Sequence, residues 1–276
     1  AESDLGFKQA WLNWELFLGR AVAYSVLWSI FAWAIPRQSR LQDPGGGATG
    51  TFTNRRLVLA FLLLFALTFS LAAFDWIMSM EPGWFSTMFA VYNFAGLFLS
   101  ALAFIIVLAI WLERGAMAGT ITDSHIHDLA KLFFGISTFW MYIWFSQYML
   151  IWYANIPEET DYFIPRIQGG WLNLLILNIV LNWGVPFLVL MRRSAKLNRR
   201  LLLSVALIVL VGRWLDLYLM IFPYITGEAP RIGVFEIGLA AGGIGLTALG
   251  LTAALRAAPL VPAGDPHLSQ SLHYHS

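Results

Sequence analysis

Long apolar stretches alternate with short polar segments along the whole chain, and this pattern predicts membrane-spanning helices. Each stretch reaches the ~20 residues that a helix needs to cross a bilayer. There are seven of them, running roughly over Ala10–Ile35, Leu57–Met80, Phe85–Leu112, Lys131–Tyr153, Trp171–Met191, Leu201–Tyr224 and Ile232–Leu255. The pattern therefore predicts an all-α fold, a polytopic transmembrane helix bundle with about seven spans.

The basic residues of the connecting segments fall mostly on one side if successive spans alternate in direction. The other side receives only Lys8, Arg166 and Arg231. The favoured side receives twelve: Arg37, Arg40, Arg55, Arg56, Arg114, Lys131, Arg192, Arg193, Lys196, Arg199, Arg200 and Arg256. By the positive-inside rule the N-terminus lies outside and the C-terminus is cytoplasmic.

This topology predicts a multi-pass protein of the cytoplasmic (inner) membrane. Residues 1–256 would form the helix bundle and residues 257–276 a short cytoplasmic tail. An outside N-terminus without a signal-peptide pattern has two explanations, a processed start or further helices upstream of Ala1. We favour upstream helices, so that the full-length protein would have more spans.

Composition excludes several classes of protein. The chain is 59% hydrophobic and 12% charged, and its net charge of +1 gives no case for nucleic-acid binding. Because it has no cysteine, it cannot hold an iron–sulfur cluster by thiolates, attach a c-type haem or form a disulfide. Its histidines fall in the predicted loop that holds His125 and His127 and in the tail HLSQSLHYH, so we expect no buried haem ligand and no metal site.

Ionisable side chains inside the spans are the candidate chemistry, since each costs ~2.5–3.5 kcal/mol at mid-bilayer without a partner. Arg213 and Asp216 lie one helical turn apart on one face near the middle of the sixth span. They form either a self-neutralising ion pair or a carboxylate on a proton path. Asp75 lies toward the outer end of the second span between Phe74 and Trp76, where we expect a satisfied buried carboxylate or a proton relay.

Three further charges belong to the candidate proton pathway. Arg20 in the first span could supply the cation for Asp75 or for Asp216. Glu81 follows the second span, where we favour capping of the next helix. Glu236 lies near the start of the seventh span, where a stabilising N-terminal charge is the simpler interpretation.

An aromatic stripe runs through the fourth span. Trp140, Trp144 and Tyr148 repeat at i, i+4 and i+8, with Gln147 beside them. The stripe either lines a quinone pocket or packs against another helix or subunit. In the fifth span Asn178 and Asn182 form a polar face that is typical of interhelical hydrogen bonding, with Gly184 and Pro186 suggesting a kink. In the seventh, the spacing Gly238-x-x-x-Gly242 predicts close helix packing.

Two long segments carry a resemblance to a known family. The runs HDLAKLFFGISTFWMYIWFSQYMLIWYANIPEET, residues 127–160, and FDWIMSMEPGWFSTMFAVYNFAG, residues 74–96, resemble the ActF-type membrane subunit of alternative complex III. That bacterial assembly is a quinol:electron acceptor oxidoreductase. The resemblance covers most of the chain from Arg55 onward, and the segment 36–54 and the tail match only loosely.

The resemblance implies an NrfD-like helix bundle without a redox centre of its own. It implies a paralogous quinol-site subunit, an iron–sulfur subunit and multihaem cytochrome c subunits as partners, with menaquinone or another quinone handled by the complex. The proposed proton-conducting acids of the family would match Asp75, Asp216 and Glu236. One departure is Gly83, which stands where the family pattern has a histidine after the proline of MEPGWFST.

Two alternatives remain open from the sequence. A proton-coupled secondary transporter would bind its substrate at buried charges in mid-membrane, although the halves show no inverted repeat and no matching pair of broken helices. A purely structural scaffold subunit would have every buried charge paired and no proton path. Water reaching Asp216 would count against the scaffold.

Overall fold

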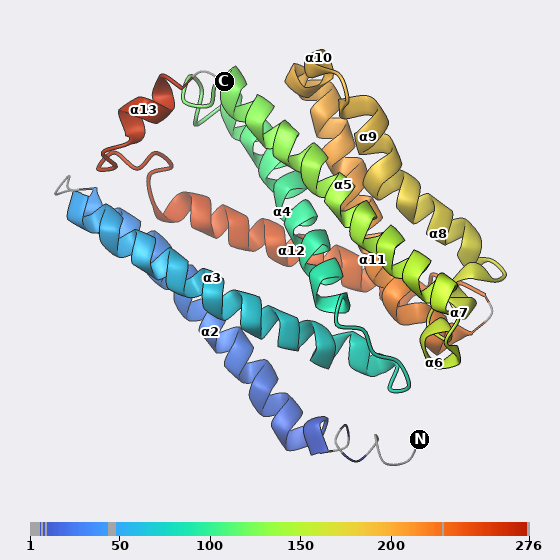
Figure 1. Cartoon of the computed structure of the whole chain (residues 1–276). Coiled ribbons are helices and arrows are strands. Elements are labelled where there is room, and N and C mark those ends of the chain that lie inside the picture. The colour runs from blue at the N-terminus through green and yellow to red at the C-terminus, as the bar shows by residue number, and fades with distance from the viewer. Residues whose placement is uncertain (1–5, 7, 9, 44–47, 228, 275–276) are drawn as a thin grey trace. The chain divides into compact units, whose positions relative to one another are not determined.

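The chain is helical throughout the residues that the computed structural model describes, which are 6, 8, 10–43, 48–227 and 229–274 (Figure 1). Among these residues there is no strand, and seven helical spans are long and apolar enough to cross a membrane. The predicted all-α class is confirmed. The chain is a multi-pass membrane protein by the length and composition of these helices.

Six of the spans are single helices and the fifth is composite. The single helices are α2 (Trp14–Gln42), α3 (Ala48–Trp76), α4 (Phe89–Glu113), α5 (Asp123–Ala154), α11 (Arg199–Thr226) and α12 (Val234–Ala257). The fifth span joins α8 (Trp171–Ile179), the π-helix η2 (Val180–Gly184) and α9 (Val185–Leu190). Short elements connect them: the 3-10 helix η1 (Met78–Met80), α6 (Pro157–Thr160), α7 (Ile164–Ile167), α10 (Arg193–Leu197) and α13 (Leu268–Leu272).

The chain divides into two compact units. Unit 1 comprises Ala1–Phe94 with Pro262–Ser269, and unit 2 comprises Ala95–Val261 with Gln270–Ser276. In unit 1, α2 and α3 lie side by side (Figure 1). Their shared face is aromatic, with Phe31 against Phe61 at 5.3 Å between ring centroids and Trp28 against Phe65 at 5.5 Å. The Nε1 of Trp28 also donates a hydrogen bond to Thr68 Oγ1 at 2.9 Å.

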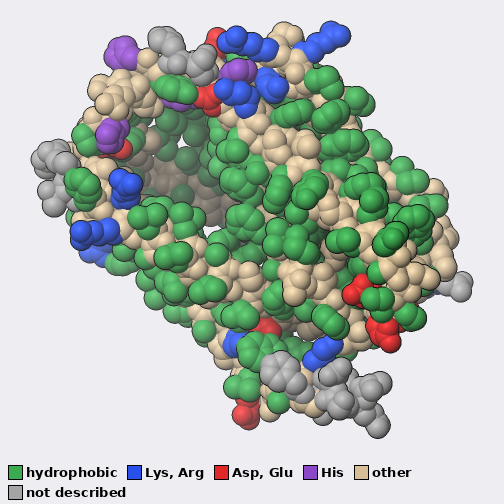
Figure 2. All heavy atoms as spheres, in the orientation of Figure 1, with side chains coloured by type: hydrophobic (Ala, Val, Ile, Leu, Met, Phe, Trp, Pro, Cys, Tyr) green, Lys and Arg blue, Asp and Glu red, His purple; other side chains and the backbone are tan. Residues whose placement is uncertain are grey.

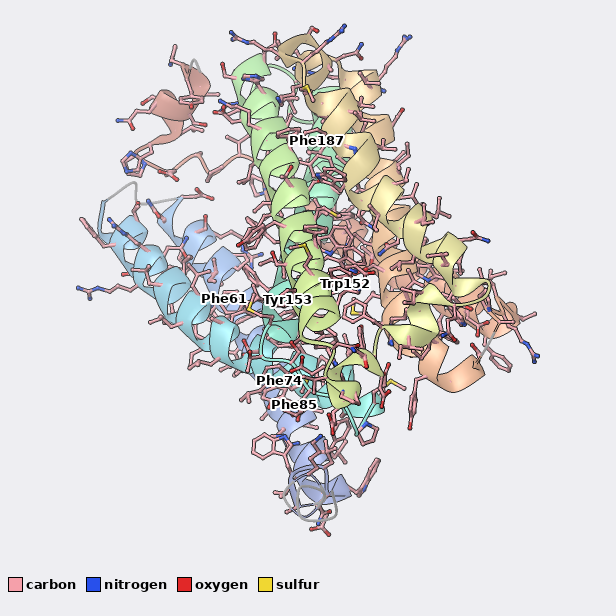
Figure 3. The ribbon with its side chains drawn as sticks, turned by 45° about the vertical axis from the view of Figure 1, so that its right-hand side comes forward. Phe61, Phe74, Phe85, Trp152, Tyr153 and Phe187 are labelled. Atoms are coloured by element: carbon pink, nitrogen blue, oxygen red, sulfur yellow. The ribbon has the colours of Figure 1, made fainter. Side chains whose placement is uncertain are left out.

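Unit 2 has its core around α11, which packs against α8, η2 and α9. A buried cluster of Trp171, Leu175, Leu215, Tyr218 and Leu219 lies between α8 and α11. By contrast, no residue of α12 is buried. Hydrophobic side chains make up most of the visible surface, as expected for a chain that faces lipid over most of its area (Figure 2). At the end of α5, Trp152 and Tyr153 are 67% and 85% exposed (Figure 3).

The start of α5 corrects one sequence prediction. The apolar pattern began at Lys131, but the helix begins at Asp123, about two turns earlier. Thr122 and His125 form a reciprocal capping box, in which the Thr122 hydroxyl accepts from the His125 backbone N–H and His125 Nδ1 accepts from the Thr122 N–H. His125 and His127 therefore lie in the first turns of α5 and not in a loop, as predicted.

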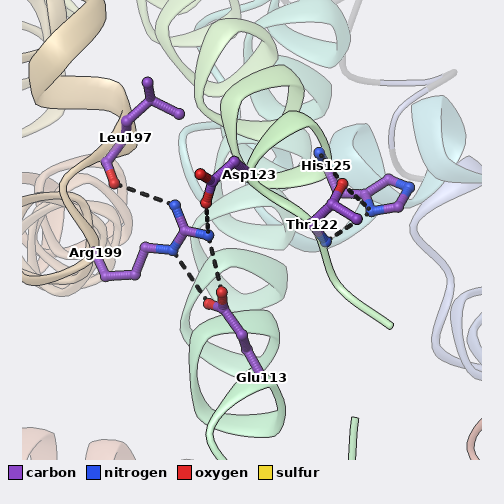
Figure 4. A network of polar contacts seen from close by, with 6 residues as sticks. All are labelled: Glu113, Thr122, Asp123, His125, Leu197 and Arg199. Atoms are coloured by element: carbon purple, nitrogen blue, oxygen red, sulfur yellow. Dashed lines mark hydrogen bonds and ion pairs between the residues drawn. The ribbon is translucent and has the colours of Figure 1, made fainter. Parts of the chain in front are cut away.

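One arginine ties three helix ends together in unit 2 (Figure 4). Arg199, at the start of α11, binds both carboxylate oxygens of Glu113 at the end of α4, with distances of 2.8 and 3.2 Å. Its Nη2 also lies 2.6 Å from Asp123 Oδ1 at the start of α5. The bidentate geometry suits guanidinium and carboxylate, so this end of unit 2 is fixed by charge-assisted hydrogen bonds.

Candidate functional site

Unit 1 buries a single carboxylate, that of Asp75, which is 2% exposed near the end of α3. Arg20 of α2 approaches it with two nitrogens, Nε at 2.8 Å from Oδ2 and Nη2 at 3.1 Å from Oδ1. Trp11 Nε1 donates to Oδ1 at 2.7 Å, and the Tyr24 hydroxyl donates to Oδ2 at 3.3 Å. Arg20 is also stacked over the Trp11 ring at 4.1 Å.

Four donors on two carboxylate oxygens make Asp75 a well-satisfied buried anion. A charge in the membrane interior is tolerated when it is paired and hydrogen-bonded, and both conditions hold here. The sequence left open whether Arg20 would pair with Asp75 or Asp216, and the structure pairs it with Asp75. This arrangement holds α2 against the end of α3.

Unit 2 buries a second polar cluster at Asp216 in α11, also 2% exposed. Arg213 Nη1 lies 2.9 Å from Asp216 Oδ2, so the pair predicted from the one-turn spacing is formed. Asn178 Nδ2 donates to Asp216 Oδ1 at 2.7 Å. Asn182 Nδ2 in turn donates to Asn178 Oδ1 at 2.7 Å, which makes a chain of hydrogen bonds running from η2 to the carboxylate.

The π-helix and a proline explain why Asn178 and Asn182 face α11. Within η2 the Val185 N–H donates to the Val180 carbonyl, five residues back, and this widening is often found at functional sites. Pro186 has no N–H, so the carbonyl of Asn182 lacks the donor that a regular helix would supply. Ser137 of α5 fills that gap, with its hydroxyl 2.7 Å from the Asn182 carbonyl oxygen.

Two glycines make room for the cluster. A Cβ at Gly96 of α4 would overlap the guanidinium of Arg213, and a Cβ at Gly212 would lie 2.8 Å from Asn182 Nδ2. Both side chains thus press directly on a neighbouring backbone. Arg213 also lies over the Trp140 ring at 5.5 Å. These contacts fix the guanidinium beside Asp216.

The two buried carboxylates differ in how firmly their charge is held. Arg20 forms directed hydrogen bonds to Asp75, whereas Arg213 Nη1 lies close to Asp216 without hydrogen-bond geometry, and Arg213 Nε has no hydrogen-bond partner among the described residues. A poorly aligned pair in a low-dielectric site gains its stabilisation mainly from the Coulomb term. Asp216 is therefore the better placed of the two to exchange a proton.

The remaining predicted acids lie at helix ends. Glu236 occupies the first turn of α12, and its Oε2 accepts from the Gly233 backbone N–H at 2.7 Å, which is the N-terminal arrangement favoured from sequence. The prediction that Glu81 caps the next helix is wrong. Glu81 lies in the turn after η1, and α4 has no acidic residue in its first turn because it begins only at Phe89.

The aromatic stripe of α5 is packed within unit 2. Trp140 is fully buried, and the rings of Trp144 and Tyr148 stack at 5.6 Å with an interplanar angle of 4°. Tyr148 then meets Phe163 edge-on at 5.5 Å. Packing accounts for these contacts, and Gln147 lies half-buried beside them. A quinone contact at the stripe stays a prediction.

A cavity of about 260 Å³ lies in unit 1, away from the residues predicted as sites. Its lining is Ser39, Gln42, Asp43, Thr51, Asn54, Arg55, Val58, Leu59, Pro262 and Asp265. The tail segment closes it, since the Gly264 N–H donates to Asp43 Oδ1 at 3.0 Å and Gln42 Nε2 donates to the Gly264 carbonyl at 3.2 Å.

Sequence reasoning missed the side chains that serve the buried backbone, Ser137 and Arg166. Arg166 of α7 is 3% exposed and donates from Nε to the Leu219 carbonyl at 3.0 Å and from Nη2 to the Met220 carbonyl at 2.8 Å. The Leu219 carbonyl is the one that Pro223 leaves without its helical donor. A proline inside an apolar span is the signal that a donor from elsewhere is needed, although it does not identify the donor.

No family model and no curated protein sequence matches this chain.

Proposed function

We propose that this chain is an integral membrane subunit of a quinol-oxidising electron-transfer complex of the alternative complex III type, without a redox centre of its own. The two long segments, residues 74–96 and 127–160, support the proposal by their resemblance to the ActF-type subunit. Seven apolar helices and the absence of cysteine agree with such a role. Quinone chemistry, c-type haem and iron–sulfur clusters would reside in partner subunits.

The observation that carries a functional role is the Asp216 cluster. A carboxylate at 2% exposure beside a guanidinium without full hydrogen bonding, with a chain of two asparagines leading to it, suits a group that accepts and releases a proton. In this proposal Asp216 takes up protons linked to quinol chemistry in a neighbouring subunit. Arg213 sets its proton affinity, and Asn178 orients the carboxylate.

The proposed setting is the bacterial cytoplasmic membrane, with the N-terminus of this chain outside and its C-terminus in the cytoplasm. The charge distribution supports this orientation, because Arg199, Arg193 and Lys196 all lie at the α10 end of unit 2. The partners would be an NrfD-like quinol-site subunit, an iron–sulfur subunit and multihaem cytochrome c subunits.

Two measurements test the proposal. Purification in mild detergent through a tag on this chain should recover haem c absorbance and an iron–sulfur protein; a colourless chain recovered alone would contradict the assignment. In vesicles containing the complex, Asp216→Asn should lower the protons moved per electron, while Glu15→Gln, an exposed acid of α2, should not. An unchanged proton stoichiometry would remove Asp216 from the path.

A scaffold role is the second candidate, and the Asp75 cluster favours it. Four donors satisfy that carboxylate and join α2 to α3, which is what a purely structural charge requires. If Asp216 were structural too, Asp216→Asn would lower the stability of the assembly without changing its proton stoichiometry.

A further inference from the structure

The cations at the α10 end of unit 2 are not equivalent, although the sequence presents them as one basic run. Arg199 is fully engaged by Glu113 and Asp123. Lys131 is paired with Asp128 at 2.5 Å, and the same carboxylate accepts the Tyr274 hydroxyl at 2.8 Å. The acids of this end are therefore already committed to Arg199, Lys131 and Tyr274.

Three cations remain without a carboxylate partner in the part of the chain that the structure describes: Arg192, Arg193 and Lys196. Arg193 and Lys196 are three residues apart in α10 and so lie on one face. Both act electrostatically on His127 of α5, as Lys131 does, which places their charges over the beginning of that helix. We call these three residues the α10 cation patch. Figure 2 shows positive side chains gathered where α10 lies in Figure 1.

An apolar strip leads from this patch along the span. Lys196 Nζ lies 4.9 Å from the centre of the Phe134 ring, Phe134 stacks on Phe187 at 5.6 Å, and Phe187 contacts Trp183 at 5.2 Å. Figure 3 labels Phe187 on α9. Beside these rings, the side chains of Leu132, Leu188 and Met191 are 45%, 73% and 55% exposed. Charge at a helix end followed by exposed apolar side chains matches the two parts of a lipid molecule.

We propose that the α10 cation patch is a binding site for an anionic phospholipid. The phosphodiester lies against Arg192, Arg193 and Lys196, and the acyl chains follow Phe134, Phe187 and Leu188. Charge complementarity identifies this occupant, because cations near a membrane surface attract anionic lipid by ~1 kcal/mol each. A zwitterionic lipid has no net charge to complement three free cations.

The test is lipid binding by the delipidated full chain, measured by native mass spectrometry with phosphatidylglycerol and with phosphatidylcholine of the same acyl chains. Phosphatidylglycerol should bind more tightly, and Arg193→Gln combined with Lys196→Gln should weaken that binding at least about tenfold. The matched control, Arg55→Gln with Arg56→Gln, removes two exposed cations from unit 1 and should leave binding within about twofold.

Further arms separate the alternatives. Because Lys196 also contacts Phe134, a second variant, Arg192→Gln with Arg193→Gln, removes charge without touching that ring. Equal affinity for the two lipids, or equal losses in patch and control variants, would overturn the site. Inorganic phosphate that raised the unfolding temperature as much as phosphatidylglycerol would overturn a lipid as the ligand.

Discussion

The hydroxyl of Ser137 in α5 donates to the backbone carbonyl of Asn182, the carbonyl that Pro186 leaves without a helical donor. The same relationship occurs a second time in unit 2, where Arg166 serves the Leu219 carbonyl released by Pro223. Unsatisfied backbone groups cost several kcal/mol in a bilayer, so each proline needs such a partner. These two donors therefore set how α5 and α7 lie against their neighbours.

Replacing Ser137 with Ala should lower the free energy of unfolding by about 1 kcal/mol, the typical size of an interhelical hydrogen bond in a membrane protein. Thr138→Ala is the control, because Thr138 bonds only to the Phe134 carbonyl in its own helix. Unfolding in mixed detergent and SDS micelles measures both. Equal effects would mean that the Asn182 carbonyl has another donor.

Replacing Arg166 with Lys should cost about 1.5–3 kcal/mol, because a single ammonium cannot reproduce the fork that reaches three carbonyls. The third carbonyl belongs to Tyr162, bound by Nη1 at 2.5 Å. Arg231→Lys, at an exposed position, should change stability by less than about 0.5 kcal/mol. The same unfolding titration decides between them, and a harmless Arg166→Lys would show that charge alone suffices.

Gly96 and Gly135 give a matched pair of helix glycines. A Cβ at Gly96 would overlap Arg213, whereas one at Gly135 meets no heavy atom within 4 Å. Gly96→Ala should displace the guanidinium and lower the proton stoichiometry as Asp216→Asn does, and Gly135→Ala should be neutral or stabilising by up to about 1 kcal/mol. Proton uptake in vesicles, measured beside an unfolding titration, checks both. Normal uptake with Gly96→Ala would show that Arg213 does not set the proton affinity of Asp216.

Tyr274 should make docking of the tail sensitive to alkaline pH. Its hydroxyl donates to the Asp128 carboxylate, and this hydrogen bond, together with repulsion of a phenolate by that carboxylate, holds the pKa of Tyr274 above its usual value. The contact is therefore complete below the ordinary tyrosine pKa of ~10 and is lost as the pH rises through the raised value.

The chain has no cysteine, so a spin label on Leu272→Cys reports tail motion alone. Label mobility should stay constant from about pH 7 to 9 and increase above ~10. Tyr274→Phe should raise mobility already at pH 8, while Tyr153→Phe should not, since that exposed side chain lies at the far end of α5. The same mobility for Tyr274→Phe and the parent chain would contradict docking through this hydroxyl.

Hydropathy predicted the spans well because lipid contact imposes length and apolarity on each one separately. The helix ends were predicted less well. The capping box at Thr122 extends α5 into a polar segment, and Glu81 falls in a turn because α4 starts late. Such ends depend on local hydrogen bonds, which an apolar window does not detect.

Pairings within one helix could be predicted, and pairings between helices could not. The spacing of Arg213 and Asp216 was sufficient to predict their contact, since i and i+3 share a face. Arg20 had two candidate partners, because sequence distance says nothing about which helices touch. The close packing expected at Gly238 and Gly242 is not formed within the described chain, where a Cβ at either position meets no atom within 4 Å.

The exposure of α12 has a consequence for how related chains can differ. None of its residues is buried, and the hydrogen bonds and ring contacts of the Asp216 cluster come from α5, α8, η2 and α11. The seventh span is thus a modular appendage to that cluster. Evolution can exchange, shorten or lose it to suit a different neighbour, while the buried charges of α11 keep their geometry.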